Sequence, residues 1–173
     1  PEACCVPVDK EVPLEVAALI GCAVTTGLGA SMNTVQIEEG AAVVIYGMGG
    51  VGLSILAGAR LAGAGPLICV DLWEEKLELA RSFGATHAFK ADGRAHENII
   101  AATAQRGADY VFEATGSTEV QEAAFDSVRP GGKLILVGLS ATGTETNFPG
   151  SVITRQEKTI LGSYYGSCDP HRD

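Results

Sequence analysis

The hexapeptide Gly47-Met48-Gly49-Gly50-Val51-Gly52 decides the fold of this chain. It follows an apolar run, Ala41–Tyr46, which we expect to form a buried strand. After it, Val51, Ile55 and Ala59 recur at the spacing of one helix face. A G-x-G-x-x-G turn between a strand and a helix is typical of a unit that binds a dinucleotide.

The glycines of this turn have separate physical roles. Gly47 permits the tight turn, Gly49 leaves room for backbone to approach a pyrophosphate, and Gly52 lets the helix pack close to the sheet. The pyrophosphate then meets free N–H groups at the start of the helix, where the helix dipole favours negative charge.

An acidic residue, Asp71, ends the next predicted strand, Leu67–Val70, and lies 19 residues past Gly52. A carboxylate at this place accepts hydrogen bonds from both hydroxyls of the adenosine ribose and repels a 2′-phosphate, so it favours NAD over NADP. Lys76 reaches the same ribose in one interpretation and is a solvated helix lysine in the other. A methyltransferase that binds S-adenosylmethionine is an alternative, because such sheets also place an acid after the second strand.

Short apolar runs alternate with helical stretches along the rest of the chain. This alternation predicts an α/β fold, a doubly wound six-stranded parallel sheet of the Rossmann type. The long stretch of turn formers at residues 140–151 predicts a loop. The expected strands are Ala41–Tyr46, Leu67–Val70, His87–Phe89, Tyr110–Phe112, Lys133–Val137 and Thr159–Leu161, and the expected helices between them are Val51–Leu61, Trp73–Phe83, Arg94–Ala104 and Thr118–Val128.

The first forty residues lack this alternation. Pro13 is suited to a helix start, and Leu14–Ile20 predicts a short helix. Gly21, Gly27 and Gly29 are then expected to break the chain. We therefore expect a short N-terminal segment from a neighbouring domain, residues 1–24, followed by a nucleotide-binding domain, residues 25–173.

Composition excludes several classes of function. The net charge of −9 argues against nucleic acid, whose phosphates need a basic face. Five cysteines without a C-x-x-C pattern argue against a disulfide framework and favour a reducing cytoplasm. The uncharged span Ala41–Ala59 nominally has the length of a membrane helix, but its glycines favour a strand, a turn and a helix instead. Because the chain begins at Pro1 and has no initiator methionine, we expect a processed product or a piece of a longer protein.

The motifs together resemble the zinc-containing alcohol dehydrogenases of the medium-chain dehydrogenase/reductase superfamily. The resemblance rests on Gly21-Cys22-Ala23-Val24-Thr25-Thr26-Gly27, the glycine turn, Asp71, the segment Gly107–Gly116 and the segment Gly131–Gly138. It implies that residues 1–24 are the tail of a GroES-like catalytic domain and that residues 25–173 bind NAD. It also implies a homodimer or homotetramer that forms through the last strand.

The resemblance implies a role for each matching residue. Cys22 is then a ligand of a catalytic zinc, and Thr26 packs against the nicotinamide. The implied coenzyme-binding residues are Gly47, Gly49, Gly50, Val51, Gly52, Asp71, Lys76, Thr115, Val137, Gly138, Leu139, Ser163 and Tyr165.

A catalytic zinc needs three protein ligands and one open position. In the resembling enzymes the other cysteine and the histidine lie upstream of the residues present here. Cys4 and Cys5 do not have the spacing of metal ligands, Cys69 is expected in the core, and Cys168 is expected in a loop. His87, His96 and His171 are expected at the surface. We therefore expect an empty or partial zinc site and little turnover by this chain alone.

The implied reaction is hydride transfer between a small alcohol or aldehyde and NAD. Three other functions remain open besides this one. They are a zinc-free quinone or enoyl reductase that uses NAD(P)H, the methyltransferase, and a non-catalytic module that senses nucleotides.

Overall fold

The structure is a computed structural model that describes residues 5–169 and residue 171. It confirms the predicted parallel sheet, whose strands run in the order β3-β2-β1-β4-β5-β6. The strands are β1 (Val43–Tyr46), β2 (Leu67–Asp71), β3 (His87–Lys90), β4 (Ala108–Glu113), β5 (Val128–Leu136) and β6 (Thr159–Gly162). The helices that connect them are α3 (Gly50–Leu61), α4 (Glu74–Ser82), α5 (Ala95–Ala102), α6 (Thr118–Asp126) and α7 (Gly150–Gln156).

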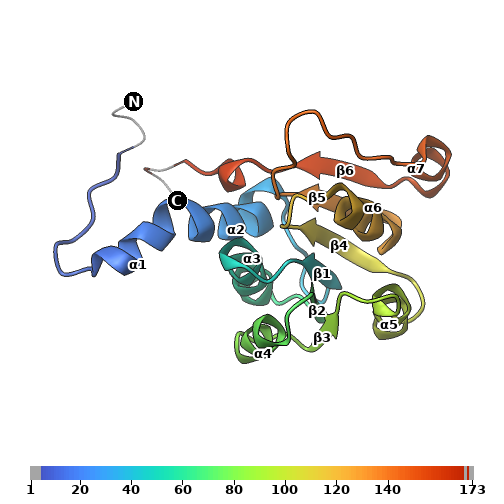
Figure 1. The fold of residues 1–173 in the computed structure, drawn as a ribbon, viewed down its shortest axis with the longest axis horizontal. Coiled ribbons are helices and arrows are strands. Elements are labelled where there is room, and N and C mark those ends of the chain that lie inside the picture. Colours follow the sequence, from blue (N-terminus) through green and yellow to red (C-terminus); the bar gives the residue numbers. More distant parts are fainter. Residues whose placement is uncertain (1–4, 170, 172–173) are drawn as a thin grey trace.

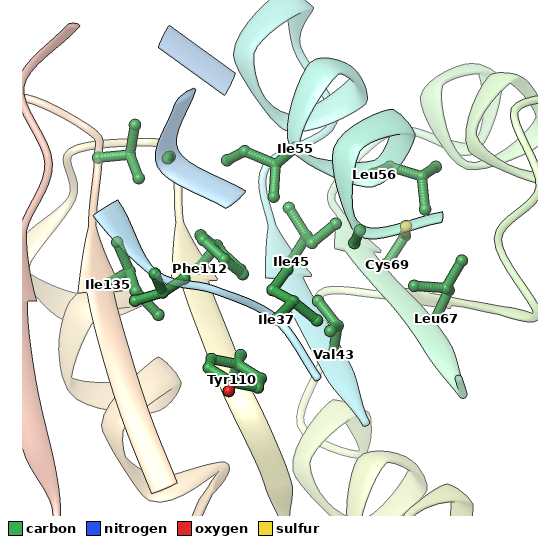
Figure 2. Close-up of a cluster of buried hydrophobic side chains, with 14 of the residues drawn as sticks. Ile37, Val43, Ile45, Ile55, Leu56, Leu67, Cys69, Tyr110, Phe112 and Ile135 are labelled. Atoms are coloured by element: carbon green, nitrogen blue, oxygen red, sulfur yellow. The ribbon is translucent and has the colours of Figure 1, made fainter. Parts of the chain in front are cut away.

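Helices cover both faces of the sheet, with α3 and α4 on one side and α5 and α6 on the other (Figure 1). Successive residues of β1 point to opposite faces, as in any strand. Ile45 therefore packs with Ile55 of α3 in one cluster, while Val44 packs with Ile99 of α5 in the other. Figure 2 shows the first cluster, which joins α3 to the strands of the sheet. The uncharged span Ala41–Ala59 is thus strand, turn and helix, as predicted.

Two predictions about the second half of the chain need correction. The strand expected at Lys133–Val137 is β5, which begins earlier, at Val128, and ends at Leu136. The stretch predicted as a loop, residues 140–151, runs into a short helix, α7, which begins at Gly150. Val152 and Ile153 of α7 pack against the second core cluster, so tertiary contact stabilises a helix that the sequence pattern does not reveal.

The prediction that glycines break the N-terminal helix is wrong. Helical structure continues from Leu14 to Thr34 as α1 (Leu14–Leu19), the π-helical η2 (Ile20–Val24), α2 (Thr25–Gly29) and the π-helical η3 (Ala30–Thr34). Gly27 and Gly29 of α2 are buried against other backbone. The predicted domain boundary between residues 24 and 25 falls inside this helix and stays a prediction.

Within the described residues, the helix Leu14–Thr34 has the length and the hydropathy that a membrane span requires, and 22% of its tested window is buried. Such a test considers length and composition alone. The first part, α1, has no buried residue and projects away from the sheet (Figure 1). The second part, α2, packs across α3, as the contacts of Gly27 show.

Candidate functional site

The order of the strands reverses between β1 and β4, which makes the carboxyl ends of these two strands a topological switch point. The turns that follow β1 and β4 meet there. Gly47, directly after β1, has φ +92°, and a Cβ on it would lie 2.6 Å from Cγ2 of Thr115. In open α/β sheets the crevice at such a point is where ligands bind.

The glycine turn has one crowded position and one open position. A Cβ on Gly52 would lie 1.8 Å from the carbonyl oxygen of Gly47, so α3 approaches the turn too closely for a side chain. A Cβ on Gly49 would meet nothing within 4 Å. Gly49 therefore exposes bare backbone at the start of α3, where Gly50, Val51 and Gly52 belong to the first helical turn, whose N–H groups have no acceptor within the helix. This geometry fits a diphosphate.

Asp71 is the last residue of β2 and is buried beside the glycine turn. Its Oδ2 accepts a hydrogen bond from the Met48 amide at 2.7 Å, and its Oδ1 accepts one from the Trp73 amide at 3.0 Å. The carboxylate thus links the turn after β1 to the turn after β2. Each oxygen retains a free lone pair, so the carboxylate can still accept hydrogen bonds from the hydroxyls of a ribose. Lys76 lies on the exposed surface of α4.

The turns after β4 and β5 are packed backbone to backbone. Gly116 has φ +80°, and a Cβ on it would lie 2.3 Å from the carbonyl oxygen of Leu139. A Cβ on Gly138 would lie 2.2 Å from the amide nitrogen of Gly116. Thr115, Val137, Gly138 and Leu139, all predicted to bind the coenzyme, are therefore brought together on the β4–β5 side of the crevice.

A buried carboxylate, Glu113, organises these two turns, although it was not among the predicted site residues. Its side chain is fully buried, and its Oε1 accepts hydrogen bonds from both the amide and the hydroxyl of Thr115 and from the amide of Gly116. Its Oε2 accepts a long one, 3.4 Å, from Gln121 of α6, whose amide also donates to Ser140 at 2.9 Å. A charged residue at the end of an otherwise apolar run was the available signal.

The predicted residues near the C-terminus are brought to α2 and η3. Ser163, after β6, shares a hydrogen bond of 2.8 Å with Thr34 at the end of η3. Gly166 packs so tightly against α2 that a Cβ on it would lie 2.6 Å from the Thr25 carbonyl oxygen and 2.9 Å from that of Thr26. Thr26 and Tyr165, which precedes Gly166, thus belong to one packed region.

Cys22 lies on η2 with an exposed side chain. The next residue, Ala23, approaches the start of α3, since a Cβ on Gly50 would lie 3.1 Å from the Cβ of Ala23. The fold therefore places Cys22 close to the glycine turn. Among the residues that the structure describes, no group of three or more His, Cys, Asp or Glu side chains could hold a metal ion. One thiol does not provide the three ligands that a zinc ion needs, so these residues alone do not fit one.

Two of the three histidines and the core cysteine lie where they were expected. Cys69 is buried in β2, and this burial raises the pKa of its thiol to about 12. His87 opens β3 and is partly buried, whereas His96 and His171 are exposed. Cys4, one of the cysteines considered above as a ligand, lies outside the described residues.

Comparisons with known proteins agree with this geometry. Residues 50–173 match the zinc-binding dehydrogenase family. The chain is 37% identical to alcohol dehydrogenase-like 2 of Arabidopsis thaliana over 172 residues, which cover 97% of this chain and 44% of that protein. It is also 37% identical to the S-(hydroxymethyl)glutathione dehydrogenase of Paracoccus denitrificans over 182 residues, or 98% of this chain and 48% of that protein.

A solved structure shares the fold at similar identity. Benzyl alcohol dehydrogenase from Acinetobacter calcoaceticus superposes with a TM-score of 0.90 at 35% identity, over 96% of this chain and 46% of that one. The switch point and its glycine turn define a Rossmann-type domain of the dehydrogenase class. The chain belongs to the zinc-binding dehydrogenase family. It spans less than half the length of these relatives.

Proposed function

We propose that this chain is the coenzyme-binding part of an NAD-dependent alcohol dehydrogenase that also uses zinc. The observation that carries the proposal is that bare backbone at Gly49 lies beside the carboxylate of Asp71. This carboxylate accepts a hydrogen bond of 2.7 Å from the amide of Met48, the residue before Gly49. The names of the relatives, alcohol dehydrogenases, support the reaction class.

Bound NAD would supply a nicotinamide that accepts or donates hydride. The residues of this chain bind and orient it. The amides at the start of α3 hold the diphosphate, and Asp71 accepts hydrogen bonds from the hydroxyls of the adenosine ribose. Thr26, Val137 and the backbone of Gly138 border the nicotinamide end of the crevice. Accurate orientation of this kind lowers the barrier to hydride transfer because it replaces a bimolecular encounter.

Cys22 is the residue of this chain that we propose as a zinc ligand. Its exposed thiol leaves room for further ligands, which the described residues do not provide. We therefore propose that the remaining ligands belong to the part of the protein beyond this chain. We also propose a small alcohol or aldehyde as the substrate.

The exposed end of the sheet suggests how copies of the chain associate. β6 is an edge strand that pairs with β5 on one side only. An edge with unpaired backbone groups invites a further strand. We propose a homodimer or homotetramer that forms through β6, in a reducing cytoplasm. Sedimentation measurements test the association, and a chain that stays monomeric at high concentration would contradict it.

Isothermal calorimetry with NAD and NADP tests the coenzyme assignment. The wild-type chain is expected to bind NAD more tightly, because the charge of Asp71 repels a 2′-phosphate. Asp71→Asn keeps the size of the side chain and is expected to reduce the preference. Glu39→Gln is the matched control, because Glu39 is an exposed carboxylate at the opposite end of the sheet. Equal affinities of the wild type for both coenzymes, or a thermal shift with S-adenosylmethionine alone, would refute the assignment.

A further inference from the structure

The strand that carries the ribose carboxylate ends in an abrupt change of exposure. All five residues of β2, Leu67–Asp71, are buried. The next two residues are large and apolar, yet Leu72 is 61% exposed and Trp73 is 62% exposed. Lone exposed apolar residues are common and need no explanation. The feature that matters here is the place of this pair, which includes an indole and lies directly beside a candidate ligand site.

The position of Trp73 in its own helix makes this exposure more informative. Trp73 is the N-cap of α4 and forms no side-chain cap hydrogen bond. Helices favour Ser, Thr, Asp or Asn at this position, because their side chains accept a hydrogen bond from the first turn. The indole therefore contributes neither to the core nor to the cap of α4, and its presence calls for another role.

The backbone fixes Trp73 next to the ribose carboxylate. Its amide donates to Oδ1 of Asp71 at 3.0 Å, while the amide of Met48 donates to Oδ2 of the same group at 2.7 Å. Asp71 thus stands between the glycine turn and Trp73. A coenzyme whose diphosphate lies at the glycine turn and whose ribose lies at Asp71 continues outward from β1 past β2. The next group of that coenzyme is the adenine base.

We propose that Trp73 forms part of the adenosine subsite, where its indole packs against the adenine or ribose of the bound coenzyme; this rests on the proposed function. The chemistry of the two partners matches. A purine presents a flat π face, and aromatic side chains are favourable surfaces for it. The role of Trp73 is to position the adenosine half of the coenzyme, away from the atoms that exchange hydride.

Fluorescence tests the placement directly, because Trp73 is the only tryptophan in the 173 residues. ADP-ribose is the probe, since it carries the adenosine and the diphosphate but lacks the nicotinamide, whose reduced form absorbs light at the wavelengths of indole emission. Saturating ADP-ribose is expected to quench or shift the emission of Trp73. Nicotinamide mononucleotide, which lacks adenosine, is expected to leave the emission unchanged. ADP-ribose that binds by calorimetry without any change in emission would overturn the proposal.

Substitution tests the contribution to affinity. Trp73→Ala is expected to weaken ADP-ribose and NADH by the same factor, about tenfold, because the lost contact lies on the half that both ligands share. Trp73→Phe keeps an aromatic face and is expected to recover most of the affinity. Phe83→Ala is the matched control, since Phe83 is an exposed aromatic residue, 42% accessible, at the other end of α4.

The outcomes separate the proposal from the function on which it rests. If NADH binds to the wild type and Trp73→Ala binds it equally well, the adenosine role of Trp73 is wrong and the coenzyme assignment stands. If neither NADH nor ADP-ribose binds to the folded wild-type chain, the coenzyme assignment itself fails. Circular dichroism of Trp73→Ala tests whether α4 still forms, which is expected because the Trp73 side chain makes no cap hydrogen bond.

Discussion

Adding one methyl group at Gly49 should separate coenzyme binding from stability. In Gly49→Ala the new Cβ meets nothing within 4 Å, and the residue has φ −81° and ψ −169°, which alanine adopts without strain. The free energy of unfolding should therefore change by no more than about 0.5 kcal/mol. A small gain is also consistent with this reasoning, because alanine restricts the unfolded chain more than glycine does.

The same methyl group should weaken NAD binding strongly. It stands where the diphosphate must approach the backbone at the start of α3. If the displaced phosphate loses one charged hydrogen bond, the cost is about 1.5–3 kcal/mol, which corresponds to a loss of about 10- to 150-fold in affinity. Calorimetry with NAD measures the affinity, and urea denaturation followed by circular dichroism measures the stability of the same sample.

Two further substitutions make the result decisive. Gly52→Ala places its Cβ 1.8 Å from the Gly47 carbonyl oxygen, so it should destabilise the fold by about 1–3 kcal/mol or more. Gly150→Ala, at the first residue of α7, also meets nothing within 4 Å and should change neither stability nor binding. A Gly49→Ala variant that binds NAD as tightly as the wild type would refute the placement of the diphosphate.

Three more outcomes follow from the structure. Gly21→Ala should raise the unfolding free energy by about 0.5–1 kcal/mol, measured by urea denaturation, because Gly21 is inside a helix and its new Cβ meets nothing within 4 Å. Burial would raise the pKa of Asp109, but the hydrogen bond and charge of Arg129 help to hold this pKa below its usual 3.8. The ionised carboxylate therefore stabilises the fold above the pKa of the unfolded chain, and this stabilisation is lost as the pH falls through the lower pKa of the folded chain. Asp109→Asn should flatten the acid limb of a stability–pH curve. A thiol reagent at neutral pH should label the exposed Cys22 and should not label Cys69 until the chain unfolds, because burial raises the pKa of the Cys69 thiol to about 12. Peptide mapping by mass spectrometry would show which cysteine is labelled.

The sheet was predictable because its signal is local. Each buried strand appears as a short apolar run, and the position of Asp71 follows from the glycine turn by a fixed spacing. Right-handed crossovers leave only a few strand orders, and the structure shows which of them is adopted, with its reversal between β1 and β4. Because parallel strands bring their carboxyl ends to one edge, Gly47 meets Thr115 there, and Gly116 meets Leu139. The binding roles of the predicted site residues stay predictions.

The parts that could not be predicted depend on contacts between distant segments. α7 contains the β-branched residues Val152, Ile153 and Thr154, which are weak helix formers, and packing on the second core cluster stabilises it. Glu113 looks like an unremarkable acid at a strand end until the turns after β4 and β5 surround it. Its partner Gln121 lies on α6, and no spacing rule connects the two.

The glycines of α2 show why propensity misled the prediction and what their position achieves. Glycine is unfavourable inside a helix, yet a Cβ on Gly27 would lie 2.4 Å from both the Ser54 Cβ and the Val51 carbonyl oxygen of α3. The close crossing of α2 and α3 thus requires glycine at that place, and the local cost is offset by contact. Because Cys22 lies on the same continuous helix, the crossing also sets where its thiol stands relative to the amides that begin α3. The distance between the proposed metal ligand and the proposed coenzyme turn is therefore determined within this chain, whatever supplies the remaining ligands.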